Sequence, residues 1–466
     1  MQKLRQVWDD FIGEINRQDL NVHAIAFGRG EEAFFKAHAR ELDPSDLHRQ
    51  FSVTKTYTAM ALMCLVEDGK ITLDDKIIDY YPDLADETDF FTSQLTIRDM
   101  LLMETSHRQT TYKINDQDPW VDSFFKIKGD HMPGSHFCYD TSSSHTLCNL
   151  VEKMTGQKLL DFLRDRGLRE AGFSDKAYII EDPEGHSMGG SGLMATLEDM
   201  YLFNAILAQD GTYKGRTVFP QERVKEAVKK HVDTQMHLGF PAESHGYGYQ
   251  LWRHAGGWWT NGMGGQFGIY VENLDLLLVL NANFQKYKGQ GQLIFDAFQN
   301  CILDKIEAED ITAYIDSGLA SDIHDLAWED SLQLMKAQGD AEWSKTIERQ
   351  GSYKTDLGNE KGLLDIGVKG DTLSLAYHGK DDLSYVLKRG VQNQVRLAGK
   401  DHRAFVSWEQ TGPDRIYILV QVLDEELGFL HAEIRFLDDA ISCHLENQVE
   451  RFYHVFKGYY YWPLES

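Results

Sequence analysis

Ser52 and Lys55 lie three residues apart, next to a long and mostly apolar run over 56–66. Residues at i and i+3 are neighbours on a helix surface, so a helix here would bring the lysine amine to the serine hydroxyl. A serine is a weak nucleophile until another group accepts its proton, and a lysine held away from solvent near other positive charge can accept it. The helix start adds backbone N–H groups and the positive end of the helix dipole. The spacing therefore indicates a serine that becomes acylated.

The sequence around this pair is informative over residues 51–83 and 95–106. It closely resembles the penicillin-binding-protein-like serine hydrolases, a family that includes class C β-lactamases, D-alanyl-D-alanine carboxypeptidases, D-amino-acid amidases and several esterases. The resemblance covers roughly the first 300 residues. It implies that Ser52 is the nucleophile and that Lys55 activates it. Read alone, Ser52 could equally be the N-cap of an apolar helix.

Tyr139 opens the best match to the family's second motif, YxN, which reads Tyr139-Asp140-Thr141 here. The resemblance implies that the Tyr139 phenol lies near Ser52 and passes a proton to the leaving group, a step worth about 10²–10⁴-fold in rate. Without the family, Tyr139 is one of 21 tyrosines, most of which are packing residues. Thr141 replaces the family's asparagine, keeping a hydroxyl but losing the amide that would hold a substrate carbonyl. Thr141 is predicted to bind substrate.

The third motif of the family, KTG or HxG on a strand, corresponds to Thr260-Asn261-Gly262. The cation at the first position of this motif is missing here. In relatives, that cation often helps to hold a substrate carboxylate. Its absence argues against a peptidase or lactamase that recognises a C-terminal acid. By resemblance, Thr260, Asn261 and Gly262 bind substrate, and the N–H groups of Ser52 and Met263 form an oxyanion hole. The alternative is an ordinary glycine-rich hairpin.

Ser187 is a rival nucleophile, because 185–189 reads Gly-His-Ser-Met-Gly and matches GxSxG. In the α/β-hydrolases this motif forms the nucleophile elbow, which needs a buried strand before the serine and a helix after it. Pro183 is poorly suited to a central strand, and the glycines that follow Ser187 disfavour a helix. The chain also lacks repeated βαβ alternation. Ser187 is therefore the weaker alternative.

The sequence predicts no metal and no cofactor. Its 18 histidines include no HExxH motif, and its five cysteines have no ligand spacing. His131, His136 and His145 cluster in sequence around Tyr139, which leaves open whether one of them lines the cleft. No phosphate-binding GxxxxGK[ST] loop is present.

The net charge of −26 and a pI near 5.0 make nucleic acid and anionic membranes poor partners. The first residues form an amphipathic pattern without the apolar core of a signal peptide, and no stretch of about 18 apolar residues is present to span a bilayer. We therefore expect a cytoplasmic protein. Its expected partner is a small-molecule amide or ester substrate. The sequence leaves the oligomeric state open.

The family resemblance implies an α+β fold of the β-lactamase and DD-peptidase type, with an antiparallel sheet flanked by helices and a helical lobe. Past residue 310 the pattern changes to an acidic helical connector over 311–348. Short alternating segments then predict an antiparallel β domain over 349–466, a sandwich or a small barrel. The first domain is expected to span 1–310, with strands at 21–27, 32–38, 246–252, 265–272 and 276–282.

The leading hypothesis is a serine hydrolase that acts on an amide or ester through an acyl-enzyme. Ser52 attacks, Lys55 is the base, Tyr139 shuttles the proton, and water releases the acid. An esterase, amidase or D-amino-acid peptidase is favoured over a true β-lactamase. The alternative is a non-catalytic binding or regulatory protein that kept the fold, with a site dismantled by the changes at Thr141 and Thr260.

Overall fold

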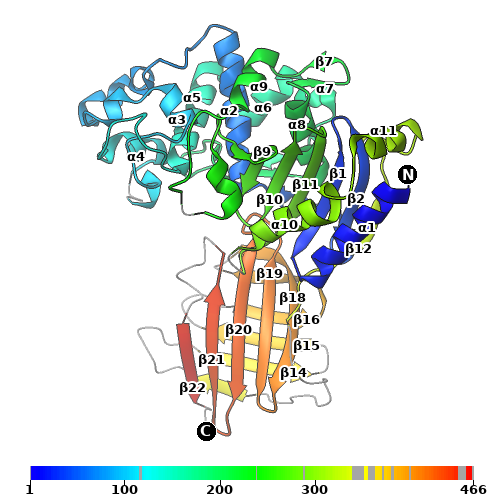
Figure 1. Ribbon diagram of the computed structural model, residues 1–466. Coiled ribbons are helices and arrows are strands. Elements are labelled where there is room, and N and C mark those ends of the chain that lie inside the picture. Colours follow the sequence, from blue (N-terminus) through cyan, green and yellow to red (C-terminus); the bar gives the residue numbers. More distant parts are fainter. Residues whose placement is uncertain are drawn as a thin grey trace. The chain divides into compact units, whose positions relative to one another are not determined.

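The computed structural model divides the chain into two compact units (Figure 1). The first comprises Met1–His38, Pro44–Ala282 and Gly289–Leu332, and the second comprises Ala39–Asp43, Asn283–Lys288 and Gln333–Ser466. The structure describes residues 2–114, 118–237, 239–286, 289–337, 351–354, 363–369, 372–378, 383–397, 400–449 and 458–463.

The first unit is built on a seven-stranded sheet in the order β12-β2-β1-β11-β10-β9-β8. Neighbouring strands from β2 to β8 pair antiparallel. The central strand β11 is buried along its whole length, as its nearly continuous apolar sequence predicts. The strands are β1 (Val22–Arg29), β2 (Glu32–Ala39), β8 (Trp252–His254), β9 (Gly257–Gly262), β10 (Gln266–Val271), β11 (Leu276–Ala282) and β12 (Trp328–Leu332).

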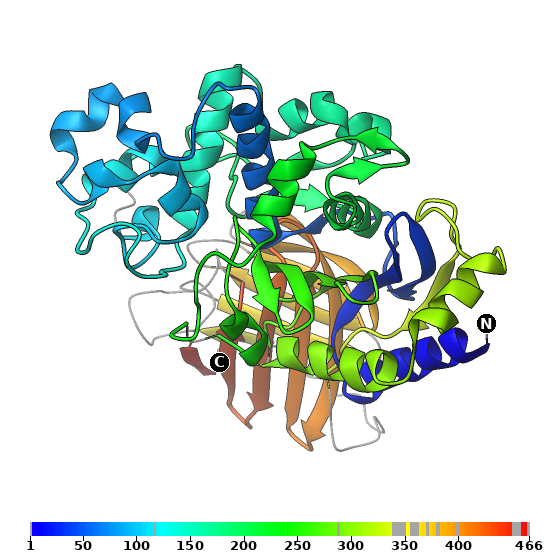
Figure 2. The same ribbon diagram turned by 45° about the horizontal axis from the view of Figure 1, so that its top comes forward.

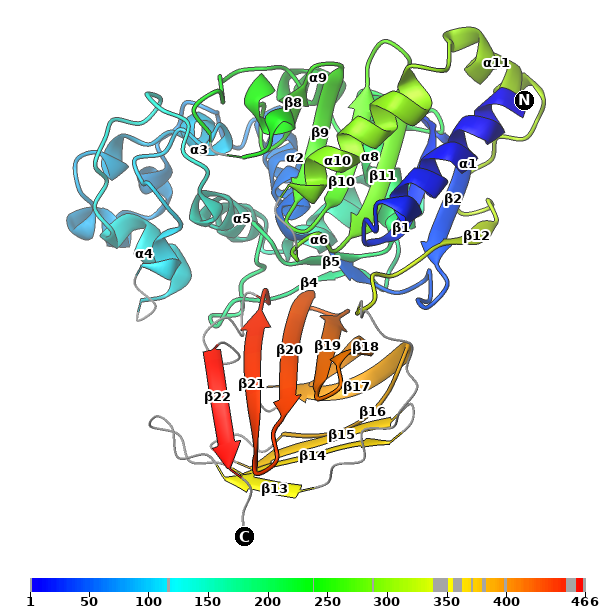
Figure 3. The ribbon, with the colours of Figure 1, turned by 60° about the horizontal axis from the view of Figure 1, so that its bottom comes forward.

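Helices cover both faces of this sheet (Figures 1 and 3). On one face lie α1 (Gln2–Arg17) and α10 (Gln290–Phe298). Trp8 of α1 stacks on Phe27 and Phe35 of the sheet. The other face is covered by α8 (Leu197–Ala208), whose side chains are buried almost all round. Beside α1 lies α11 (Ala308–Asp316).

A helical lobe stands at one side of the sheet, and α2 (Thr54–Glu67) runs through it (Figure 2). Every residue from Thr54 to Leu65 is buried, so α2 is a core helix rather than a surface one. Packed against it are α5 (Thr141–Thr155), α6 (Leu159–Leu163) and α9 (Gln221–Ala227). The side chain of Asp140 caps α5 by accepting the Ser142 N–H. The lobe also holds α3 (Ile97–Leu101), α4 (Trp120–Lys126) and α7 (Arg169–Ala171).

The second unit is an antiparallel meander of consecutive strands in a four-stranded and a six-stranded sheet. The two sheets adjoin at β16 and β17, and β13 adjoins β22. The core of the larger sheet includes Val406, Trp408, Ile418 and Ile434. The strands are β13 (Gly351–Lys354), β14 (Leu363–Lys369), β15 (Thr372–His378), β16 (Leu383–Lys388), β17 (Val391–Leu397), β18 (Lys400–Gly412), β19 (Arg415–Val422), β20 (Gly428–Phe436), β21 (Ala440–Asn447) and β22 (Gly458–Pro463).

The predicted α+β fold and the antiparallel C-terminal domain are confirmed, and two local predictions differ from the structure. The segment 246–252 is mostly irregular, because Gly246 and Gln250 have φ of +122° and +63° and β8 begins only at Trp252. Of the helical connector predicted over 311–348, the part that the structure describes, 311–337, is helical only at its start. A glycine with φ of +71°, Gly318, follows α11, and β12 then joins the main sheet within the first unit. Residues 338–348 lie outside the described ranges.

Across the described residues, no helix has both the length and the apolar character needed to cross a bilayer.

Candidate active site

Ser52 and Lys55 meet at the start of the central helix of the lobe. Ser52 lies in the short turn η1 (Phe51–Val53), and Lys55 lies in the first turn of α2. Lys55 Nζ is 2.9 Å from Ser52 Oγ. Phe51 has a φ of +44°, which is rare for a bulky residue and is found mainly where function constrains the backbone. The two groups that the sequence predicted as neighbours are therefore in contact.

The Lys55 side chain is almost fully buried and has two further oxygen partners. Its Nζ lies 2.7 Å from the carbonyl oxygen of Gly190 and 3.2 Å from Thr141 Oγ1. A Cβ on Gly190 would lie 2.6 Å from Thr141 Cγ2 and 2.9 Å from the Thr141 carbonyl oxygen. The missing side chain therefore lets the Gly190 carbonyl approach Lys55. Thr141, predicted to bind substrate, contacts the lysine that adjoins Ser52.

The ring of Tyr139 also lies close to this lysine. The centroid of its ring is 4.9 Å from Lys55 Nζ, within the range of a cation–π contact. The ring is half-buried and stacks on Trp252 with a centroid separation of 5.6 Å. Burial raises the pKa of the Tyr139 phenol, a hydrogen bond with Ser52 lowers it, and the charge of Glu243 raises it again, for a net increase. The phenol is therefore protonated at neutral pH and can donate its proton.

Asn261 and Gly262 end strand β9 beside η1. A Cβ on Gly262 would lie 2.2 Å from the carbonyl oxygen of Gln50, so the absent side chain lets the strand approach the backbone near Ser52. Asn261 is half-buried and donates through Nδ2 to Glu243 Oε1 at 2.8 Å. Met263 follows in the turn to β10, and 42% of it is exposed.

The side chain of Thr260 points to the face of the sheet opposite that of Asn261, because successive residues of a strand alternate between its faces. The residue is fully buried, and its hydroxyl donates to Asn204 Oδ1 of α8 at 3.0 Å. This differs from the expectation that Thr260 binds substrate. We therefore leave Thr260 out of the substrate-binding residues proposed below.

The Beta-lactamase family model matches residues 10–296, which is more than half of the chain and includes every residue of this site. The chain belongs to the Beta-lactamase family. The resemblance seen around Ser52, Tyr139 and Asn261 is thereby confirmed at the level of the family.

This Beta-lactamase family member is similar, at low identity, to a curated relative and to solved structures. A 6-aminohexanoate-dimer hydrolase of Paenarthrobacter ureafaciens is 22% identical over 218 residues, 43% of this chain and 55% of that protein. The match thus spans about half the length of this curated relative. The D-amino acid amidase of Ochrobactrum anthropi SV3 has a TM-score of 0.51 at 16% identity and covers 64% of this chain and 99% of its own.

An octameric penicillin-binding protein homologue from Pyrococcus abyssi extends the likeness beyond the first unit. It has a TM-score of 0.50 at 14% identity, and the match covers 98% of this chain and 99% of that one. Likenesses at these identities show the fold alone. They are consistent with the β-lactamase type of architecture described above.

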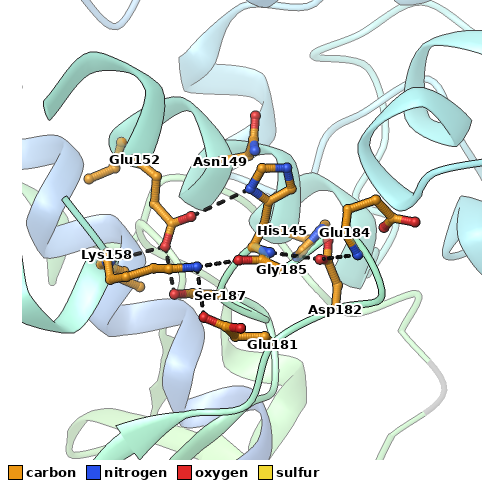
Figure 4. Close-up of polar contacts among 12 residues, drawn as sticks. His145, Asn149, Glu152, Lys158, Glu181, Asp182, Glu184, Gly185 and Ser187 are labelled. Atoms are coloured by element: carbon orange, nitrogen blue, oxygen red, sulfur yellow. Dashed lines mark hydrogen bonds and ion pairs between the residues drawn. The ribbon is translucent and has the colours of Figure 1, made fainter. Parts of the chain in front are cut away.

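Figure 4 shows the polar contacts around Ser187, the alternative nucleophile of this family member. Its buried hydroxyl donates to Glu152 Oε1 of α5 at 2.6 Å. The backbone around it forms an isolated bridge to Glu181 instead of the strand, turn and helix of an elbow. The imidazole of His145 lies nearby but pairs with Asp182 at 2.9 Å. These contacts tie a loop to α5 and disfavour Ser187 as the nucleophile.

Of the three histidines that lie near Tyr139 in sequence, His131 and His136 stay together in the structure, with ring centroids 6.0 Å apart. His145 is buried against Asp182, His131 contacts Asp130, and His136 is exposed. Within the described ranges, no group of three or more His, Cys, Asp or Glu side chains is placed to hold a metal ion.

Sequence reasoning missed two residues of this site. Gly190 lies outside the three motifs, although the pair Gly189-Gly190 signals a close backbone approach. Glu243 lies in η7 (Pro241–His245), more than 100 residues from Tyr139 in sequence, and carries no motif. Only the fold places Glu243 near this site.

Proposed function

We propose that this Beta-lactamase family member is a serine hydrolase that forms an acyl-enzyme on Ser52. The observation that carries the proposal is the 2.9 Å separation of Lys55 Nζ and Ser52 Oγ, with the lysine almost fully buried and the serine half-buried. Ser52 Oγ attacks the carbonyl carbon of an amide or ester while its proton passes to Lys55. The N–H groups of Ser52 and Met263 are the proposed oxyanion hole, and loss of one such donor typically costs about 3–4 kcal/mol.

The hydrogen-bond partners of Lys55 fit the role of a base. A neutral amine offers two N–H donors and one lone pair. The Gly190 carbonyl can only accept, and Thr141 Oγ1 can accept the second N–H. The lone pair can then face Ser52 Oγ and take its proton. This gives Thr141 a part in orienting the base.

Tyr139 is the proposed proton donor to the leaving group. In the tetrahedral intermediate, the bond between the carbonyl carbon and the leaving nitrogen or oxygen breaks as the phenol protonates that atom. Lys55 then returns its proton to Tyr139. Water attacks the acyl-enzyme, gives one proton to the base, and releases the acid and the Ser52 hydroxyl.

Amides and esters without a C-terminal carboxylate are the proposed substrates. Where relatives carry a cation in the third motif, this chain has Thr260, which is buried and uncharged. The amidase from O. anthropi, judged by its name, acts on amides. We therefore expect amidase or esterase activity to exceed penicillin hydrolysis. Asn261 and Gly262 are the proposed contacts to substrate.

A fluorophosphonate probe tests the proposal together with labelled penicillin and short-chain p-nitrophenyl esters. The wild-type protein should be labelled by the fluorophosphonate and should hydrolyse the esters, and Ser52→Ala should do neither. Labelling by penicillin would favour a lactamase or peptidase. An inert wild-type protein would contradict the hydrolase and favour a binding protein that kept the fold.

A further inference from the structure

Glu243 places a negative charge beside the proposed acyl-enzyme site. The residue is only 9% exposed. Its Oε1 accepts from Asn261 Nδ2 at 2.8 Å, and its Oε2 accepts from the Phe240 N–H at 3.2 Å. His237 Nε2 lies 3.5 Å from Oε2. In the described part of the chain, neither a lysine nor an arginine pairs with this carboxylate, although buried charges in proteins are generally paired.

Contacts on two sides connect Glu243 to the reacting groups. Its partner Asn261 directly precedes Gly262, whose backbone approaches that of Gln50 near Ser52. Its other neighbour, His237, has its ring centroid 6.3 Å from that of Tyr139. The charge of Glu243 also helps to raise the pKa of Tyr139. A group bound to Glu243 would therefore lie close to a carbonyl that Ser52 attacks.

Aromatic rings line the same region. The ring of Trp252 stacks on Tyr139 and has its centroid 5.1 Å from that of His237. Phe137 lies 5.7 Å from His237, and Tyr247 lies 4.9 Å from Trp252, again between centroids. Aromatic faces attract cations. A carboxylate within an aromatic wall therefore favours a positive group and repels a second negative one.

We propose that Glu243 and Asn261 form a subsite for an ammonium group, so that the enzyme prefers amides and esters that carry a free amine near the scissile carbonyl. The choice of substrate rests on the proposed function, but binding at the subsite does not require Ser52. Because Asn261 Nδ2 donates to Glu243, its Oδ1 remains an acceptor, and the carboxylate has lone pairs beyond its present bonds. An ammonium has three donors and no acceptor, which matches such a pair.

The first experiment measures binding alone. In Ser52→Ala, the affinities of D- and L-alaninamide are compared with that of propanamide, which lacks only the amine, by isothermal titration calorimetry at pH 7. At least one alaninamide enantiomer should bind about 10-fold more tightly or better, the size expected for hydrogen bonds to charged groups. In Ser52→Ala/Glu243→Gln the ratio should fall to about 1. Glu226→Gln, at an exposed ion pair with Lys229, should leave it unchanged.

The second experiment measures turnover with the Ser52 enzyme. We expect kcat/KM for an alanine p-nitroanilide to exceed that for propanoyl p-nitroanilide, and Glu243→Gln to remove the excess while propanoyl turnover persists and shows that the variant is folded. If Glu243→Gln fails to fold, Asn261→Ala replaces it, and a partial loss of the preference is expected.

The outcomes separate the two proposals. Equal affinities in Ser52→Ala, or a preference that survives in Glu243→Gln, would overturn the ammonium subsite even if the enzyme hydrolyses neutral amides. Selective binding of an alaninamide by Ser52→Ala, together with a wild-type protein that hydrolyses none of the substrates, would support the subsite and overturn the proposed hydrolase.

Discussion

Lys55 Nζ lies 2.7 Å from the carbonyl oxygen of Gly190, closer than to the Ser52 hydroxyl. A carbonyl can only accept a hydrogen bond, so this contact fixes one N–H of the amine and the direction of the remaining groups on the nitrogen. We therefore expect the position of the Gly190 backbone to control how the proposed base meets the proposed nucleophile.

Gly190→Ala should lower kcat about 10-fold or more with a smaller effect on KM. The new Cβ would meet Thr141 Cγ2 at 2.6 Å, so either Thr141 or the Gly190 carbonyl must move, and small displacements of positioned groups cost large factors in rate. Steady-state kinetics on a p-nitrophenyl ester check this. Gly13→Ala, in α1 with open space around its Cβ, should keep wild-type kinetics. Unchanged kcat in Gly190→Ala would contradict the role of the carbonyl.

Lys55→Arg should lose about 10²–10⁴-fold in kcat/KM, the range of a general base. An arginine cannot deprotonate in a protein, so it keeps the positive charge but offers no lone pair to Ser52. The rate of labelling by a fluorophosphonate should fall in parallel, because that reaction also needs an activated Ser52. Activity of Lys55→Arg near the wild-type level would show that charge alone suffices.

Tyr139→Phe should lower kcat for amides about 10²–10⁴-fold. The effect on activated esters such as p-nitrophenyl acetate should be smaller, since their leaving group departs without protonation. Because the pKa of Tyr139 is raised above its usual value near 10, a proton donor at this position stays protonated to at least pH 9.5. The wild-type pH profile for amide hydrolysis should therefore show no decline due to Tyr139 below that pH. Equal losses on amides and activated esters would argue against proton donation by Tyr139.

Asp182→Asn should destabilise the protein at pH 7 by about 1.5–3 kcal/mol, the value of a hydrogen bond to a charged group. Burial alone would raise the pKa of Asp182, but bonds from the His145 side chain and the His186 N–H lower it overall. A depressed pKa stabilises the fold above the unfolded value of about 3.9, and this contribution is lost as pH falls through the folded value.

Urea denaturation at pH 7 and at pH 3 measures this contribution. The difference between wild type and Asp182→Asn should shrink at the lower pH. Asp175→Asn, with a side chain 83% exposed, should change stability little at either pH. A difference that grows on acidification would have the wrong sign for this explanation.

Local patterns predicted the parts of the site that lie close together in sequence. The contact between Ser52 and Lys55 follows from helix geometry and a three-residue spacing, and the family motif placed Tyr139 beside them. The strands at 21–27, 32–38 and 276–282 were predictable for the same reason, since each carries its own apolar pattern between turn residues.

Features set by the register of strands and by distant loops were not predictable. The motif alone did not show that Thr260 turns toward α8 while Asn261 turns toward Glu243, because that depends on which face of β9 meets η1. The position of Glu243 depends on a loop without a motif. The helical prediction over 311–348 followed composition, whereas pairing at the edge of the sheet decides β12.

Intact-protein mass spectrometry after exposure to a fluorophosphonate, followed by peptide mapping, identifies the nucleophile directly. We expect a single covalent adduct on Ser52 in the wild-type protein and none in Ser52→Ala. Ser187→Ala should be labelled at the wild-type rate. An adduct on Ser187, or persistent labelling of Ser52→Ala, would contradict the assignment of the nucleophile.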